Sequence, residues 1–134
     1  KTILQKEIDK LKVKNVIIKN PVTRSELRDI YNNSDYLLIH LNNYSAFKKV
    51  LPSKIFELAT FPKTILAGVS GYSANFINKE VSDSYVFNPC DISSLVSFLK
   101  TNNQSDHIER NKFKTKFDRS LINNQFSAKI LKYL

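Results

Sequence analysis

Three short apolar runs, spaced along the first half of this 134-residue chain, constrain its fold more than any other feature. They are NVIIKN at residues 15–20, DYLLIHL at 35–41 and KTILAGV at 63–69. Each has the continuous apolar character of a buried strand, and helical patterns separate them. Strands that alternate with helices indicate βαβ units. We therefore predict an α/β fold with a Rossmann-like parallel sheet and flanking helices.

Local capping and periodicity signals predict the remaining elements. Thr23 and Glu26 match a T-x-x-E capping box, which predicts that a helix begins between the first two runs. The same kinds of pattern predict helices at about 52–59 and 73–78, a weaker strand at 84–88, a helix capped by Asp91, and two helical segments after about residue 105. The predicted fold therefore ends in a helical tail.

The carboxyl ends of the predicted strands are where a ligand crevice is expected. In doubly wound sheets the ligand binds where the loops leave the strands and lead into helices. The loops expected there are NPVT at 20–23, NNYSAFKKVLPS at 42–53 and SGYS at 70–73. The second loop is the longest, and long loops at this edge often carry function.

The arrangement Ser53-Lys54-x-x-Glu57 follows this long loop directly. If the helix starts at Pro52, the amides of Ser53, Lys54 and Ile55 are free, and they favour an anion such as phosphate. Ser53 and Lys54 add a hydroxyl donor and a charge, and Glu57 offers an acceptor for paired hydroxyls. The alternative is an ordinary capped helix with a solvated glutamate. A capping box, however, requires the acid three residues after the cap, where this chain has a phenylalanine.

The charge balance and the cysteine content limit the classes of partner. The chain has 21 Lys and Arg against 12 Asp and Glu, a net charge of +9, which favours nucleic acid, an anionic membrane surface or a phosphate-bearing ligand. No recognisable nucleic-acid module accompanies the charge, so we do not expect sequence-specific nucleic-acid binding. The single Cys90 excludes an internal disulfide and favours a reducing, cytoplasmic compartment.

Other candidate groups have simpler interpretations. His40 ends a predicted strand at the crevice edge, where it is either a ligand or, more commonly, a structural histidine. No spacing of histidine or cysteine indicates a metal site. Ser70 and Ser73 lie in the loop after the third strand, where they either contact a ligand or serve the turn. The chain contains no methionine, so we expect it to be part of a longer protein.

The stretch LPSKIFELATFPKTILAGVSG at residues 51–71 resembles the donor-nucleotide segment of the family 4 retaining glycosyltransferases. It is closest to the bacterial surface-polysaccharide branch, with its pattern P-S-K-hydrophobic-x-E. The stretches at 15–41 and 86–99 are similar to the family segments on either side. The resemblance implies a two-domain GT-B fold, of which residues 1–134 would be part of the C-terminal donor-binding domain. The N-terminal acceptor domain would be absent.

The resemblance also implies an activity. Such an enzyme transfers a sugar from a nucleoside diphosphate to an acceptor with retention of configuration, without a required metal or any cofactor besides the donor. The acceptor would be a glycan or a lipid-linked glycan at the cytoplasmic face of the membrane, and the net charge of +9 is compatible with peripheral membrane contact. Because the family's other catalytic groups lie outside these residues, we expect the isolated chain to bind nucleotide weakly and not to turn over.

The implied site comprises seven residues, and no catalytic residue is assigned. Ser53 and Lys54 would contact the diphosphate, and Glu57 would hold the ribose hydroxyls. The remaining members would flank the base or approach the sugar and phosphate: Pro21, Val22, Lys49 and Ser70. Lys49 occupies the position, eight residues before Glu57, near which the family pattern has a second glutamate. A different class of function stays open, namely a non-enzymatic α/β binding module with a basic surface, because fold alone does not determine function.

Overall fold

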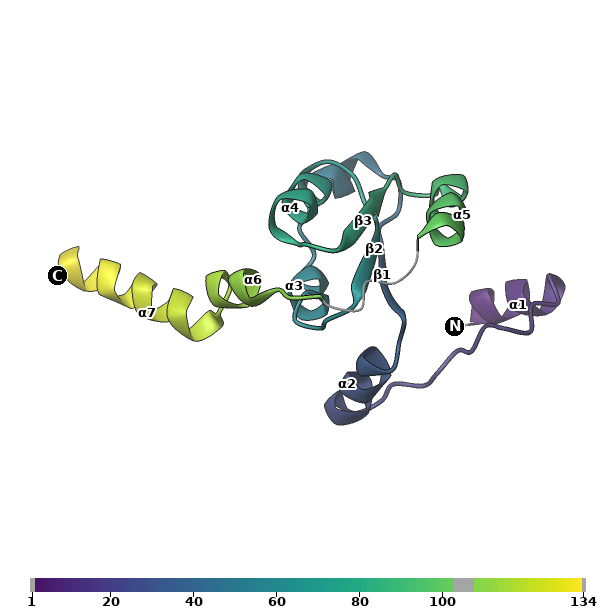
Figure 1. The fold of residues 1–134 in the computed structure, drawn as a ribbon, viewed down its shortest axis with the longest axis horizontal. Coiled ribbons are helices and arrows are strands. Elements are labelled where there is room, and N and C mark those ends of the chain that lie inside the picture. Colours follow the sequence, from purple (N-terminus) through teal and green to yellow (C-terminus); the bar gives the residue numbers. More distant parts are fainter. Residues whose placement is uncertain (1, 103–107, 134) are drawn as a thin grey trace. The chain divides into compact units, whose positions relative to one another are not determined.

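The computed structural model describes residues 2–102 and 108–133 (Figure 1). The chain divides into two compact units, Lys1–Ile30 and Tyr31–Leu134, which are described separately. The first contains helix α1 (Thr2–Lys10) and most of helix α2 (Arg24–Asn32). The second contains the sheet and all the later helices.

The strand predicted at residues 15–20 is not formed. These residues run between α1 and α2 without regular secondary structure, and Ile17 is 81% exposed. A β-branched run becomes a strand only when a neighbouring strand pairs with it and its side chains are buried, and this run has neither. Helix α1, which the sequence patterns did not predict, buries none of its side chains.

Helix α2 begins with the predicted capping box. The Thr23 amide and hydroxyl both donate to Glu26 Oε2 at 2.8 Å, and the Glu26 amide donates to Thr23 Oγ1 at 3.3 Å. Two backbone donors that the helix cannot satisfy internally therefore have side-chain acceptors.

This capping box makes the stability of α2 sensitive to acid. The hydrogen bonds from the Thr23 amide and then the Thr23 hydroxyl lower the pKa of Glu26 from its ordinary value of 4.5. Because the pKa is lower in the folded helix, the stabilisation is fully present above about pH 4.5 and is lost as the pH falls through the lowered pKa. We expect the helicity of α2, followed by NMR chemical shifts, to fall in this acid range. A Glu26→Gln variant should lack this step, and a step of the same size in the variant would contradict the assignment.

The second unit is built on a three-stranded parallel sheet (Figure 1). Its strands are β1 (Tyr36–His40), β2 (Thr64–Gly68) and β3 (Ser84–Phe87), in the order β1-β2-β3. Helix α3 (Lys54–Leu58) lies in the first crossover and helix α4 (Tyr72–Glu80) in the second. The predicted α/β class with a parallel sheet is confirmed, and the arrangement is consistent with a Rossmann-like fold.

The helices lie on both faces of the sheet. Leu37 and Ile39 of β1 point into a core shared with α3 and α4; its buried members are Leu37, Ile39, Ile55, Leu58, Ala59, Ile65, Ala67, Val69, Ile77, Val81 and Phe113. Helix α5 (Ile92–Thr101) lies on the other face (Figure 1). There Phe98 stacks on Tyr85 of β3 with ring centroids 4.0 Å apart. On that face Leu38 of β1 remains 59% exposed.

Helix α5 and the helical tail agree with the sequence patterns. Asp91 caps α5 as predicted, with Oδ1 accepting from the Ser94 amide at 3.0 Å and Oδ2 from the Ser94 hydroxyl at 2.6 Å. The tail consists of α6 (Asn111–Lys116) and α7 (Arg119–Ile130), followed by a 3-10 turn. The two predicted helical segments are confirmed, although the start predicted near residue 105 lies outside the described residues.

Arg110, just before α6, is buried at the amino-terminal end of the sheet with 4% of its surface exposed. Its Nε donates to the Ser82 carbonyl at 2.9 Å and its Nη1 to the Phe61 carbonyl at 2.6 Å. Its Nη2 donates to the carbonyls of Lys63 at 2.9 Å and Asp83 at 3.0 Å. Burial lowers the pKa of Arg110, against the opposing effect of the Asp83 charge. This single side chain therefore joins the tail to the segments that lead into β2 and β3.

Candidate functional site

Helix α3 follows the long loop after β1, and it starts later than predicted. The helix runs from Lys54 to Leu58, and Ser53 precedes it without a side-chain capping bond. The Ile55 amide donates to the Pro52 carbonyl at 3.1 Å, so the expectation that this amide is free was wrong. The chain forms a tight turn at Pro52, and the hydrogen bond of this turn occupies the Ile55 amide. Among the described residues, only the amides of Ser53 and Lys54 remain without an acceptor at this helix start.

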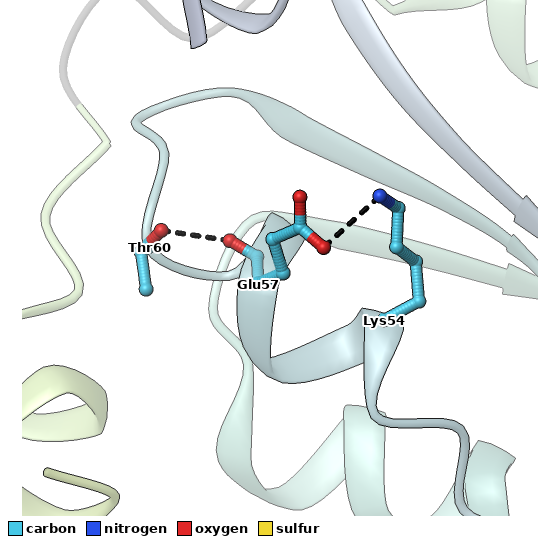
Figure 2. Close-up of polar contacts among 3 residues, drawn as sticks. All are labelled: Lys54, Glu57 and Thr60. Atoms are coloured by element: carbon cyan, nitrogen blue, oxygen red, sulfur yellow. Dashed lines mark hydrogen bonds and ion pairs between the residues drawn. The ribbon is translucent and has the colours of Figure 1, made fainter. Parts of the chain in front are cut away.

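Lys54 and Glu57 form an ion pair on the outer side of α3, as Figure 2 shows. The distance from Lys54 Nζ to Glu57 Oε2 is 3.0 Å, and the two side chains are 44% and 45% exposed. The buried positions Ile55 and Leu58 hold the opposite side of the helix in the core. Thr60 donates its hydroxyl to the Glu57 carbonyl at 2.7 Å and so completes the last turn (Figure 2).

Tyr31, at the end of α2, completes the surroundings of Lys54. The ammonium lies 5.1 Å from the centroid of the Tyr31 ring, close enough for a cation–π interaction. Partial burial works to lower the pKa of Lys54, but Tyr31 and the Glu57 carboxylate outweigh it, and the net effect is a raised pKa. Lys54 is therefore a fixed positive charge at neutral pH. Sequence patterns did not reveal this contact, because no local pattern relates Tyr31 to a lysine in a later helix.

This pair can serve two kinds of ligand group at once. An ammonium has three donors, and Glu57 occupies one of them, so Lys54 can also donate to an anion. A carboxylate has about four acceptor positions, so Glu57 can accept from hydroxyl groups while it remains paired. The Ser53 hydroxyl and the two unbonded amides lie beside the ammonium in sequence. Lys54 and Glu57 thus form one small polar group on α3, and Ser53 directly precedes it in sequence.

The loops after β1 and β2 contact each other, as expected for loops at one sheet edge. Lys49 is exposed in a 3-10 turn (Ser45–Lys49) of the first loop. The backbone of Gly71 in the second loop packs against the Lys48 carbonyl. Ser73 is fully buried and donates its hydroxyl to the Val50 carbonyl. Ser73 is therefore a structural residue that joins the loops, and it is unavailable to a ligand.

Ser70 lines a surface depression whose lining does not include Lys54 or Glu57. This depression, of about 300 Å³, is at the carboxyl ends of β2 and β3. It is lined by Val69, Ser70, Gly71, Ala74, Tyr85, Val86, Phe87, Asn88, Asp91 and Ser94. Neither Lys49 nor any member of the group on α3 belongs to this lining. The roles of Lys49 and Ser70 beside a sugar stay predictions.

Pro21 and Val22 belong to the first unit. Both are exposed in the segment that precedes α2. Their role beside a nucleotide base stays a prediction.

His40 has a structural partner. Its Nε2 accepts from the Cys90 amide at 3.0 Å, which joins the end of β1 to the turn after β3. The close approach of the His40 ring to Gly68 leaves no room for a side chain at that position. These contacts support the interpretation of His40 as a structural histidine.

The described residues contain neither a candidate metal site nor a membrane-spanning helix. Within residues 2–102 and 108–133, His, Cys, Asp and Glu side chains form no group of three or more that could hold a metal ion. No helix of this described part combines the length and apolar character needed to cross a bilayer. Comparison with known protein families, curated proteins and solved structures finds no match to this chain.

Proposed function

We propose that this chain is part of the donor-binding domain of a family 4 retaining glycosyltransferase and that it binds a nucleoside-diphosphate sugar. In the complete protein the sugar would be transferred to an acceptor of surface polysaccharide or glycan synthesis. The observation that carries the proposal is the Lys54–Glu57 pair, half-exposed on the helix that follows the loop after β1. The resemblance of residues 51–71 to the donor-nucleotide segment of that family adds support.

The proposed roles follow from the chemistry of each group. Lys54 and the Ser53 hydroxyl would bind the diphosphate, with help from the two unbonded amides. Glu57 would accept from the ribose hydroxyls, while Lys49 and Ser70 would approach the sugar. As the donor bond breaks, negative charge develops on the departing diphosphate, and the positive charge of Lys54 would stabilise it. A cytoplasmic location, in the reducing compartment that a single cysteine favours, forms part of the proposal.

Titration of UDP and GDP against the chain and a Glu57→Ala variant tests this function. Removing a hydrogen bond to a charged group costs about 1.5–3 kcal/mol, so we expect the Kd to rise about 10- to 100-fold. Glu7→Ala is the matched control, because Glu7 also pairs with a lysine three positions away, Lys10, at 3.9 Å. The control should bind as the unaltered chain does.

Two results would oppose the proposal. Equal loss of affinity in both variants would indicate a general effect of charge. Absence of saturable binding in the full-length protein would favour the non-enzymatic binding module instead.

A further inference from the structure

An aromatic cluster joins α3 to the helical tail. Phe56 of α3 lies 5.3 Å from Phe117 and 6.1 Å from Phe113, measured between ring centroids. Phe76 of α4 lies 5.4 Å from both Phe56 and Phe117. Phe113 and Phe117 are themselves 4.7 Å apart, and Phe113 is 5% exposed. The rings thus form one contiguous contact among three helices.

The tail segment 110–117, which carries Phe113 and Phe117, is held by polar contacts at its start and near its end. At its start, Arg110 donates to the four carbonyls that precede β2 and β3. Near its end, Lys116 Nζ contacts both carboxylate oxygens of Glu80, at the end of α4, at 2.7 Å. The segment is therefore tied both to the sheet and to α4.

Helix α3 depends on such contacts for its position. It has only five residues, and a helix of this length is not stable by itself. Lys54, Phe56 and Glu57 share the backbone of this short helix, so a movement of Phe56 that carries the helix with it changes the direction of Lys54 and Glu57. The contact of Phe56 with the tail is thus a constraint on where the ion pair points.

We infer that the tail segment 110–117 is a brace that sets the geometry of the Lys54–Glu57 pair, with Phe113 and Phe117 as positioning residues. The contacts between the segment and α3 carry this inference, and only its consequence for nucleotide binding rests on the proposed function. When the contacts between segment 110–117 and α3 are weakened, α3 turns and Lys54 moves away from the Tyr31 ring. A ligand that needs Lys54 and Glu57 together then binds less tightly.

The test compares Phe117→Leu with Phe98→Leu by NMR. Both positions are partly buried aromatic residues, but Phe98 stacks on Tyr85 on the opposite face of the sheet. The Lys54 ε-methylene protons report the geometry directly, because the Tyr31 ring close to the ammonium shifts their resonances. We expect this shift to diminish in Phe117→Leu and to persist in Phe98→Leu. An unchanged shift in folded Phe117→Leu, or equal changes in both variants, would overturn the inference.

A milder variant serves if Phe117→Leu does not fold. Lys116→Gln removes the contact with Glu80 from an exposed side chain and leaves the aromatic cluster in place. It should change the Lys54 resonances in the same direction, by less. Unchanged Lys54 resonances in this variant would also overturn the inference.

A UDP titration of the same proteins separates the brace from the proposed function. If the unaltered chain binds UDP, Phe117→Leu should weaken binding about tenfold, because a small displacement of a positioned group is costly. If the Lys54 resonances move but the unaltered chain does not bind nucleotide, the brace is supported and the proposed function fails. If binding and the Lys54 resonances are both unaffected by Phe117→Leu, the brace fails while the proposed function stands.

Discussion

Replacing Arg110 by methionine is expected to lower the free energy of unfolding by about 4 kcal/mol, since four carbonyls lose a donor worth roughly 1 kcal/mol each. The total free energy of unfolding of a native domain is about 5–15 kcal/mol. Methionine fills a similar volume without donors, so the carbonyls at the amino-terminal end of the sheet would lose this partner. The expected outcome is a chain that is partly unfolded without denaturant or that unfolds at a much lower urea concentration.

The measurement is urea unfolding followed by circular dichroism, with Arg119→Met as the matched control. Arg119 is exposed at the start of α7, and a surface change of this kind usually alters stability by no more than about 0.5 kcal/mol. A loss below about 1 kcal/mol for Arg110→Met would show that water replaces the guanidinium.

Replacing Gly71 by alanine is expected to lower the free energy of unfolding by about 2–6 kcal/mol. The backbone at Gly71 has φ 64° and ψ −131°, close to a region that is essentially restricted to glycine, and other residues there cost about 1–3 kcal/mol. An added Cβ would also collide with the Lys48 carbonyl, and relief of such overpacking costs about 1–3 kcal/mol. The backbone strain and the collision arise at the same residue, and both disturb the junction of the loops after β1 and β2.

Ser70→Ala is the control for this substitution, because Ser70 is adjacent and does not have a positive φ. Thermal unfolding of the two variants should separate them clearly, with the lower melting temperature for Gly71→Ala. NMR resonances of residues 45–50 should also change in Gly71→Ala, because the Lys48 carbonyl must move. Equal melting temperatures would mean that the turn at Gly71 adjusts freely.

The strands and helices of the second unit could be predicted because their signals are local. The run at 35–41 contains β1, the run at 63–69 contains β2, and Asp91 caps α5 as its spacing indicated. The capping box at Thr23 and Glu26 was confirmed for the same reason, since three residues suffice to form it. Patterns of this length carry most of the information about element type.

Contacts between distant residues could not be predicted from the sequence. The run at 15–20 has the composition of a strand, but strand formation depends on a pairing partner that no local pattern specifies. Arg110 looked like one basic residue among many, and its burial depends on carbonyls 27 to 49 positions away. The Lys54–Glu57 spacing was visible, whereas the position of the Tyr31 ring beside Lys54 was not.

The Lys54–Glu57 pair has a consequence for selectivity between ligands. A free phosphate ion that approaches Lys54 meets the Glu57 carboxylate 3.0 Å from the ammonium and is repelled by it. A ligand that carries hydroxyl groups beside its phosphate would offset that repulsion, because its hydroxyls can donate to Glu57 while its phosphate pairs with Lys54. Discrimination of this kind comes as much from penalising the wrong ligand as from favouring the right one. In a chain with a net charge of +9, which attracts anions of every sort, the half-exposed Glu57 carboxylate would make a ligand site at Lys54 selective in this way.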